Sequence, residues 1–201
     1  MVNWCEENNL VLNVSKTKEI VVDFRSKQSA ISPLLINNQE VEIVDCFKFL
    51  GCTISSNLTW DAHVLTVRKK AQQRLYFLRQ LKKFRLNQTI LVQFYRSVIE
   101  SILTFSMTTW FGSTSQQNRD DLHRVVRSAS KIIGCEVPTL QDLYDARLIR
   151  KAKSILSDET HPAHTIFQPL PSGKRYRTIY AKTERARNTF FYRAVKAVSV
   201  I

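Results

Sequence analysis

The chain has 201 residues, 44% of them hydrophobic, and its 30 Lys and Arg against 17 Asp and Glu give a formal net charge of +13. This composition supports a folded core, and the length allows one domain or two small ones. The sequence contains no run of about 18 apolar residues, so we expect no transmembrane helix and no membrane partner. The positive charge favours a polyanionic partner, with nucleic acid ahead of anionic lipid.

The start of the chain and its cysteines indicate an intracellular protein, either nuclear or cytoplasmic. Residues 1–9 have neither the basic start nor the apolar run of a secretory signal. The cysteines show no C-x-x-C spacing, and we expect them to be buried free thiols in a reducing compartment. They are Cys5, Cys46, Cys52 and Cys135.

The N-terminal part of the chain predicts a small antiparallel sheet. Residues 2–10 are helix-like, and the pair Asn8-Asn9 is a typical stop signal for a helix. Residues 19–24 are compact and β-branched, which favours a strand. The mostly polar stretch 25–33 indicates a loop.

Two further segments complete the predicted sheet. Residues 34–36 and 41–44 flank the turn-forming pair Asn37-Asn38, so we expect a hairpin. Residues 46–54 continue as one strand that Gly51 interrupts, which indicates a bulge or a close backbone approach.

After Asn57 the pattern changes from strands to helices. Residues 60–85 have apolar residues at every third or fourth position, which predicts an amphipathic helix. Further helices are expected at 88–110, 116–134 and 139–157. The helix at 88–110 is apolar on most sides and should therefore be the central buried one.

Single residues mark the ends of these helices. Asn87 is suited to cap the helix that follows it, and Gly112 and Gly134 are suited to stop the helices that precede them. The tail at 158–201 is basic, with aromatic residues between its cations. These rings either stack on nucleic-acid bases or anchor the tail to the core, and both alternatives stay open. They are Tyr176, Tyr180, Phe190, Phe191 and Tyr192.

The helix at 60–85 also has a strongly basic side. Eight basic residues and no acidic one lie between 68 and 85. At about 100° per residue, four of them share one arc beside and behind the apolar stripe. This arc is either a solvated surface or a site for negative charge, and no acid within the stretch neutralises it. The four residues are Arg68, Lys69, Arg79 and Lys83.

Several short motifs resemble those of non-LTR, LINE-type retrotransposon reverse transcriptases. Residues 12–18, Leu-Asn-Val-Ser-Lys-Thr-Lys, are similar to the loop called motif D. Residues 47–54, Phe-Lys-Phe-Leu-Gly-Cys-Thr-Ile, followed by Leu-Thr-Trp at 58–60, resemble motif E, the primer grip. The helix after them resembles the thumb, and segments between 94 and 175 resemble the C-terminal tail of such elements.

The resemblance implies contacts with nucleic acid for three groups of residues. The motif D lysines would lie near the phosphates of an incoming nucleotide, the motif E turn would contact the primer end, and the thumb cations would hold the template–primer backbone. We add the basic start of the tail to this set. The candidate nucleic-acid-binding residues are Lys16, Lys18, Phe49, Leu50, Gly51, Arg68, Lys69, Lys70, Arg74, Arg79, Lys82, Lys83, Lys174, Arg175 and Arg177.

The polymerase centre of that family lies in aspartates that this sequence does not contain. A Tyr/Phe-x-Asp-Asp turn and a further aspartate would be expected before residue 1, and the adjacent acid pairs at 6–7, 120–121 and 158–159 have the wrong neighbours. Two-metal phosphoryl transfer requires such carboxylates. The four histidines also lack metal-ligand spacing. We therefore expect no enzymatic activity, no cofactor and no metal.

Together these features predict an α+β fold, with a small antiparallel sheet followed by a mostly helical, thumb-like bundle. We expect three parts: a palm-end remnant with a primer-grip-like hairpin at 1–56, the bundle at 57–157 and a basic aromatic tail at 158–201. The predicted function is that of a truncated, non-catalytic remnant that binds RNA or DNA regardless of sequence. The sequence does not specify an oligomeric state.

Besides a segment of a longer, active polymerase, two alternatives remain. The basic segment at 60–85 is also similar to segments named after the N-terminal region of AlkB homologue 8, a name linked to tRNA methyltransferase and 2-oxoglutarate-dependent dioxygenase activities. That dioxygenase chemistry needs His-x-Asp or His-x-Glu and a distal histidine, and neither dipeptide pattern occurs in this chain. The other alternative is a basic helical module that binds proteins.

Overall fold

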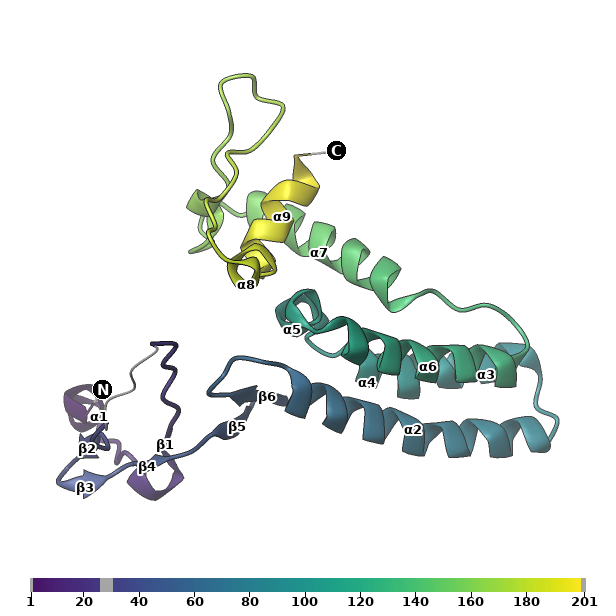
Figure 1. Cartoon of the computed structure of the whole chain (residues 1–201), viewed down its shortest axis with the longest axis horizontal. Coiled ribbons are helices and arrows are strands. Elements are labelled where there is room, and N and C mark those ends of the chain that lie inside the picture. Colours follow the sequence, from purple (N-terminus) through teal and green to yellow (C-terminus); the bar gives the residue numbers. More distant parts are fainter. Residues whose placement is uncertain (1, 26–30, 200–201) are drawn as a thin grey trace. The chain divides into compact units, whose positions relative to one another are not determined.

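The computed structural model describes residues 2–25 and 31–199 (Figure 1). The chain forms two compact units, Met1–His63 and Val64–Ile201. Short strands occupy the first unit and helices the second, which confirms the predicted α+β class. The three parts predicted at 1–56, 57–157 and 158–201 stay a prediction, because compactness by itself gives two units.

The first unit contains very short elements. Among its described residues, six strands pair two by two, and the β1–β4 pair is parallel whereas β2–β3 and β5–β6 are antiparallel. The expected single antiparallel sheet is therefore wrong. The elements are α1 (Val2–Glu7), η1 (Val14–Lys16), β1 (Lys18–Glu19), β2 (Leu35–Ile36), β3 (Gln39–Glu40), β4 (Glu42–Ile43), β5 (Cys46–Phe49) and β6 (Cys52–Ser55).

The strand predicted at 19–24 is wrong for all but its first residue. Only Glu19 lies in β1, and residues 20–25 have no regular structure. β-Branched residues favour extended backbone, but a strand also needs a neighbour to pair with, and β4 pairs with only two residues of β1. Part of the loop predicted at 25–33 lies outside the described residues.

The turn at Asn37-Asn38 is confirmed, although the hairpin around it is shorter than predicted. Both asparagines have positive φ, 51° and 59°, as a two-residue hairpin turn of the primed type requires. The returning strand therefore starts at once, at Gln39, and pairs Ile36 with Gln39. Residues 42–43, expected in this hairpin, pair in parallel with β1 instead.

Residues 46–54 form a hairpin and not one interrupted strand. Leu50 and Gly51 are its two turn residues, with φ of 45° and 88°, and Phe49 pairs with Cys52 across the ladder. The glycine is therefore needed for the turn rather than for a bulge, because such turns require positive φ at both central positions. Cys46, at the start of β5, is exposed and Cys135 is half-buried, so the expectation of buried thiols holds only for Cys5 and Cys52, although all four are free.

The second unit is built from helices. Helix α2 crosses from the first unit and ends two residues before the predicted end at 85. The apolar stripe predicted along it is buried from Val64 to Leu78. The elements are α2 (Asp61–Lys83), α3 (Gln88–Phe94), η2 (Tyr95–Glu100), α4 (Ser101–Leu103), α5 (Met107–Trp110), η3 (Phe111–Ser113), α6 (Gln116–Ile133), α7 (Leu140–Leu156), η4 (His164–Ile166), α8 (Glu184–Arg187) and α9 (Phe190–Val198).

The helix predicted at 88–110 is broken into several pieces. It begins as expected, with the Asn87 side chain accepting a hydrogen bond from Ile90 N at 2.9 Å. A π-helical segment, η2, follows, and the helix then stops before Ser106, which has a φ of 47°. The carbonyl of Phe105, freed by this break, accepts a hydrogen bond from the Trp110 indole at 2.9 Å.

The π-helical segment explains the position of the core residues in this region. The fully buried side chains of α3, η2 and α4 recur every four residues, and in an α-helix each such step advances about 40° past a full turn. Three steps would rotate the stripe by about 120°, away from the core. The wider π turn offsets part of this drift, which helps to keep one face buried. The residues are Leu91, Tyr95, Ile99 and Leu103.

Helices α6 and α7 have the predicted ends. Gly134, with a φ of 87°, follows α6 in the left-handed conformation and donates its N–H to Ser130 O. Thr139 and Asp142 form a capping box at the start of α7. Gly112, by contrast, does not stop a helix, because the chain continues through it as the 3₁₀ turn η3. Gly112 instead lies at a point where segments of the chain approach each other closely.

The C-terminal tail is partly folded. Helix α9 packs along α7 and buries Ala194, Val195 and Val198. The Phe167 ring meets the rings of Tyr176 and Phe191 edge-on, so the anchoring alternative holds for these two aromatics. Figure 1 shows the segment between η4 and α8 as a long loop that extends away from the helices.

Candidate nucleic-acid interface

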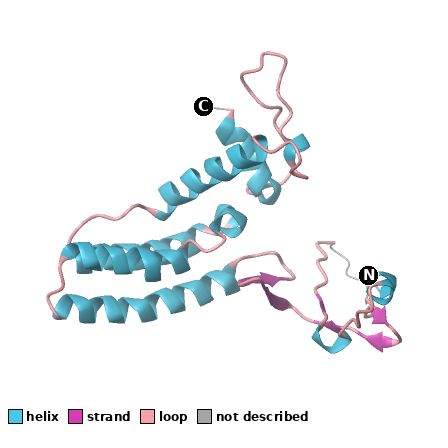
Figure 2. Ribbon diagram, turned by 180° about the vertical axis from the view of Figure 1, so that it is seen from behind, coloured by secondary structure: helices cyan, strands magenta, loops and turns pink. Residues whose placement is uncertain are grey.

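The long helices α2 and α6 lie side by side (Figure 2), and the labels and sequence colours of Figure 1 show that they run in the same direction. Near their N-terminal ends Arg68 forms an ion pair with Asp121. Near their C-terminal ends Lys82 Nζ donates to the carbonyl of Ile133 at 3.4 Å. These two contacts fix the pair in register at both ends.

Arg68 is already paired within the protein and is not free to bind phosphate, although its position on α2 predicted that it would be. The expectation that no acid neutralises the basic arc is wrong for this residue, because Asp121 lies 53 positions further along the chain, on the neighbouring helix. Asp121 also pairs with Arg124 at 3.0 Å, and its side chain is only 12% exposed. Arg68 therefore serves first to join α2 to α6.

A shallow groove of about 270 Å³ lies between the two helices and carries positive charge. Leu75 and Val125 contribute apolar surface, and Arg79 from α2 and Arg124 from α6 contribute the cations. Arg124 keeps 62% of its side chain exposed despite its ion pair. No carboxylate pairs with Arg79 within the described part of the chain, so this groove has an excess of positive charge.

The outer side of α2 holds further exposed cations and, unexpectedly, exposed rings. Lys69 and Lys83 are exposed, and no described residue forms an ion pair with either. Tyr76 and Phe84 are 57% and 74% exposed. These rings lie off the buried stripe, a signal that the sequence already contained in their spacing. We use the name α2–α6 surface for Lys69, Arg79, Lys83 and Arg124.

The remaining α2 candidates have different surroundings. Lys70 is exposed, and the guanidinium of Arg74 lies 5.8 Å from the centroid of the Phe77 ring. Lys82 is engaged at the end of α6, as described above. Arg124, which the sequence did not single out, belongs with these residues because α6 packs beside α2.

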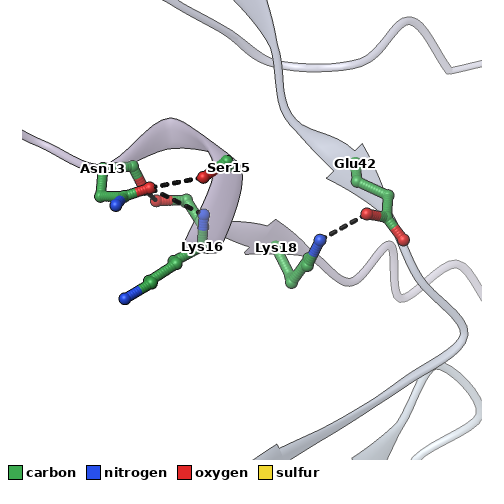
Figure 3. Close-up of polar contacts among 6 residues, drawn as sticks. Asn13, Ser15, Lys16, Lys18 and Glu42 are labelled. Carbon is green, nitrogen blue, oxygen red and sulfur yellow. Dashed lines mark hydrogen bonds and ion pairs between the residues drawn. The ribbon is translucent and has the colours of Figure 1, made fainter.

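The two motif D lysines are held differently (Figure 3). The Asn13 side chain accepts hydrogen bonds from Lys16 N at 3.1 Å and from Ser15 Oγ at 2.7 Å, which fixes the short helix η1. The Lys16 side chain is exposed. Lys18 forms an ion pair with Glu42 on the adjacent strand β4, so only Lys16 presents an uncompensated charge.

The motif E candidates form the tip of the β5–β6 hairpin. Phe49 and Leu50 are 56% and 79% exposed, and Gly51 completes the turn. Exposed apolar groups at a hairpin tip are suited to contact another molecule. The hairpin and the motif D loop both lie in the first unit. They are parts of different sheets, because β5 pairs with β6 whereas β1, at the end of the motif D loop, pairs with β4.

The basic start of the tail lies in the long loop before α8. Backbone hydrogen bonds from Leu170 N to Arg175 O and from Arg177 N to Gln168 O, at 2.8 Å and 2.7 Å, close the loop into a hairpin-like tip. Gly173, with a φ of 68°, makes the turn. Lys174, Arg175 and Arg177 are all exposed on this tip.

Across residues 2–25 and 31–199, no three His, Cys, Asp or Glu side chains gather into a group that could hold a metal ion. His63 Nδ1 accepts from Thr53 N at 3.3 Å, and His161 Nδ1 accepts from Ala163 N at 3.1 Å. Burial lowers the pKa of His123 below its usual range, which favours the neutral ring.

Comparison with known proteins gives one family match. The family described as alkylated DNA repair protein alkB homolog 8, N-terminal, matches residues 60–101, a stretch that spans α2, α3, η2 and the first residue of α4. The match covers well under half of the chain. No curated protein and no solved structure is significantly similar. None of the helices within the described ranges is long and apolar enough to cross a membrane.

Proposed function

We propose that the α2–α6 surface binds the phosphate backbone of RNA or DNA without reading its sequence. The observation that carries this proposal is the set of exposed cations on two helices held in register, three of them with no ion-paired carboxylate among the described residues. Phosphate contacts hold a protein on nucleic acid but do not specify bases. The exposed rings of Tyr76 and Phe84 add surfaces on which unpaired bases stack.

We also propose that the chain derives from a LINE-type reverse transcriptase and does not itself catalyse a reaction. Support for this comes from the order of the motifs at 12–18 and 47–60, and from the hairpin β5–β6 leading directly into the long basic helix α2. The residues that contact nucleic acid in this proposal require no cofactor. Its site of action would be the nucleus or the cytoplasm.

The family match concerns the same helices. Residues 60–101 include the whole of α2, so the shared feature with the AlkB homologue 8 N-terminal region is the basic helix and its neighbour. As a separate alternative, which does not rest on this match, we propose that the chain is a basic helical module that binds proteins. We propose no dioxygenase or methyltransferase step, because the sequence has no His-x-Asp or His-x-Glu pair.

A salt titration separates the two proposals. For duplex DNA, the logarithm of the binding constant falls with the logarithm of salt at a slope near −0.9 per phosphate neutralised. Replacing Lys69, Arg79 and Lys83 by Gln keeps helix propensity and the buried stripe. Fluorescence anisotropy should then show a slope smaller in magnitude by roughly 2.7, and scrambling the duplex sequence should change the affinity little.

The matched control removes the same charge from another helix. Arg150, Lys151 and Lys153 are exposed on α7, and their replacement by Gln should leave the slope close to that of the unaltered chain. The unaltered chain, the α2 variant and the α7 variant should all show intact folds by circular dichroism. Equal salt slopes for the three would refute the nucleic-acid proposal and favour the protein-interaction module.

Primer extension tests the non-catalytic part of the proposal. The purified chain, incubated with a template–primer, Mg²⁺ and deoxynucleotides, should give no product above a boiled control, since the sequence has no Tyr/Phe-x-Asp-Asp turn. Reproducible extension would contradict this part and leave the binding proposal untouched.

A further inference from the structure

A second, larger cleft lies at the C-terminal end of the molecule, away from the residues of the α2–α6 surface. Its walls come from helix α7, from the extended segment 178–181 and from α8 and α9, and its volume is about 1130 Å³. This exceeds the roughly 300–1,000 Å³ of typical small-molecule sites. The cleft therefore has room for part of a polymer.

The cleft carries an excess of positive charge. Arg187, Arg193 and Lys196 line it, against the single carboxylate of Asp145. Lys196 is exposed, and its ammonium has no ion-pair partner among the residues that the structure describes. The charge is complementary to a ligand that carries more than one negative group.

The two arginines are fixed in place by contacts within the walls. Arg187 Nε donates to the carbonyl of Ala181 at 3.3 Å, and Arg193 donates to Asn188 Oδ1 at 2.6 Å. The Arg193 guanidinium also lies 5.9 Å from the centroid of the Tyr144 ring. Cations held in this way lose little conformational entropy when they bind an anion.

Aromatic and apolar groups complete the lining. Tyr180 is 83% exposed although it belongs to the cleft, and Tyr192, which also lines the cleft, is half-buried. Leu148 and Ile149 from α7 add apolar surface. A ring that stays exposed next to fixed cations is suited to stack on a planar group that itself carries phosphate.

We propose that this cleft binds a single-stranded segment of RNA or DNA, with a base stacked on Tyr180 and phosphates held by Lys196 and Arg187. A base in a duplex is already stacked on its neighbours and does not present its face to Tyr180. Single strands expose both the base faces and the backbone, which matches the two kinds of group in the cleft. This site is independent of the α2–α6 surface and goes beyond the binding proposed for it.

The test measures how one double variant changes the binding of two different probes. A fluorescein-labelled 12-nucleotide oligouridylate represents the single strand, and a labelled 24-base-pair DNA duplex represents the double strand. Tyr180→Ala combined with Lys196→Gln should weaken binding of the oligouridylate about tenfold or more and of the duplex less than twofold. Because both side chains are exposed, the melting temperature should stay close to that of the unaltered protein.

Two controls make the result specific. Tyr180→Phe keeps the stacking ring and should bind the oligouridylate as the unaltered chain does, whereas Lys153→Gln, on α7 but outside the cleft, should have no effect. Unchanged oligouridylate affinity in the double variant would overturn this proposal, as would an equal loss for both probes. The Lys69, Arg79 and Lys83 variant affects duplex binding separately, so failure of one proposal is distinguishable from failure of the other.

Discussion

The hydroxyl of Tyr144 lies against the backbone of Gly112, so closely that a Cβ at position 112 would be 2.6 Å from Tyr144 Oη. The same Cβ would be 2.8 Å from the carbonyl of Asn188, one of the two residues that link α8 to α9. Gly112 is thus where the turn after α5, helix α7 and the C-terminal helices meet. Burial raises the pKa of Tyr144, which keeps its hydroxyl protonated in this contact.

Replacing Gly112 by Ala should destabilise the second unit by about 1–3 kcal/mol, because a methyl group has no space in this tightly packed contact. Thermal unfolding followed by circular dichroism measures the effect. Thr109→Ala, at an exposed position three residues earlier, is the control and should change the melting temperature little. Equal melting temperatures for Gly112→Ala and the unaltered chain would contradict the close packing described above.

Replacing Gly51 by Val should destabilise the β5–β6 hairpin by roughly 1–3 kcal/mol, since a β-branched residue is strained at a φ of 88°. Asparagine tolerates positive φ better than other side chains, so Gly51→Asn should retain most of the stability. Hydrogen exchange of the amides in 46–55 reports on this hairpin directly. Similar protection in the Val and Asn variants would show that the turn does not depend on backbone conformation at this position.

Glu100 predicts a dependence of stability on pH. Burial raises its pKa in the folded protein, although the nearby Arg96 and Arg147 oppose the shift. The folded state therefore holds the proton to higher pH than the unfolded state does. The contribution of Glu100 to the stability of the folded protein is fully present below the pKa that this residue has in the unfolded state. It is lost as pH rises through the pKa that Glu100 has in the folded state.

Glu100→Gln removes this titration and tests it. The substitution should raise the free energy of unfolding at pH 8, where the buried carboxylate is charged, and should raise it less or not at all at pH 4. Urea unfolding at the two pH values measures the difference. Glu159→Gln, in an exposed turn, is the control. A benefit of Glu100→Gln that does not change with pH would contradict the assigned role of burial.

The four thiols should react at different rates. Cys46 is exposed at the start of β5 and Cys135 is half-buried, so Cys135 should react more slowly than Cys46, whereas Cys5 and Cys52 are buried. A chromogenic disulfide reagent should therefore modify Cys46 rapidly and the two buried thiols only as the unit opens. Cys46→Ser should remove the fast phase, and Cys52→Ser should leave it in place. A fast phase that persists in Cys46→Ser would contradict the exposure described for β5.

The helices could be predicted from the sequence far better than the strands. Periodicity over many residues, a cap at Asn87 and a stop at Gly134 are local signals, and each lies within the segment that it defines. Strand pairing is not local. Nothing near residues 42–43 indicates that they pair in parallel with β1, and Leu50-Gly51 is a turn only because residues on both sides pair with each other.

The candidate interface was predictable only in part, for the same reason. The arc on α2 follows from spacing, but the carboxylate of Asp121 that neutralises Arg68 is supplied by a different helix. Arg124 entered the set only once α6 was known to lie beside α2. The cleft around Tyr180 could not be derived at all, because its residues come from three segments whose proximity is a property of packing.

The parallel arrangement of α2 and α6 has an electrostatic consequence. Two helices that point the same way place the partial negative charges of their last carbonyls at the same end, where their dipoles repel each other. Lys82 donates to one of these carbonyls, that of Ile133, and Lys131 lies in the last turn of α6. Lys82 therefore holds the two C-termini together, and its positive charge is already committed to the protein itself before any ligand binds.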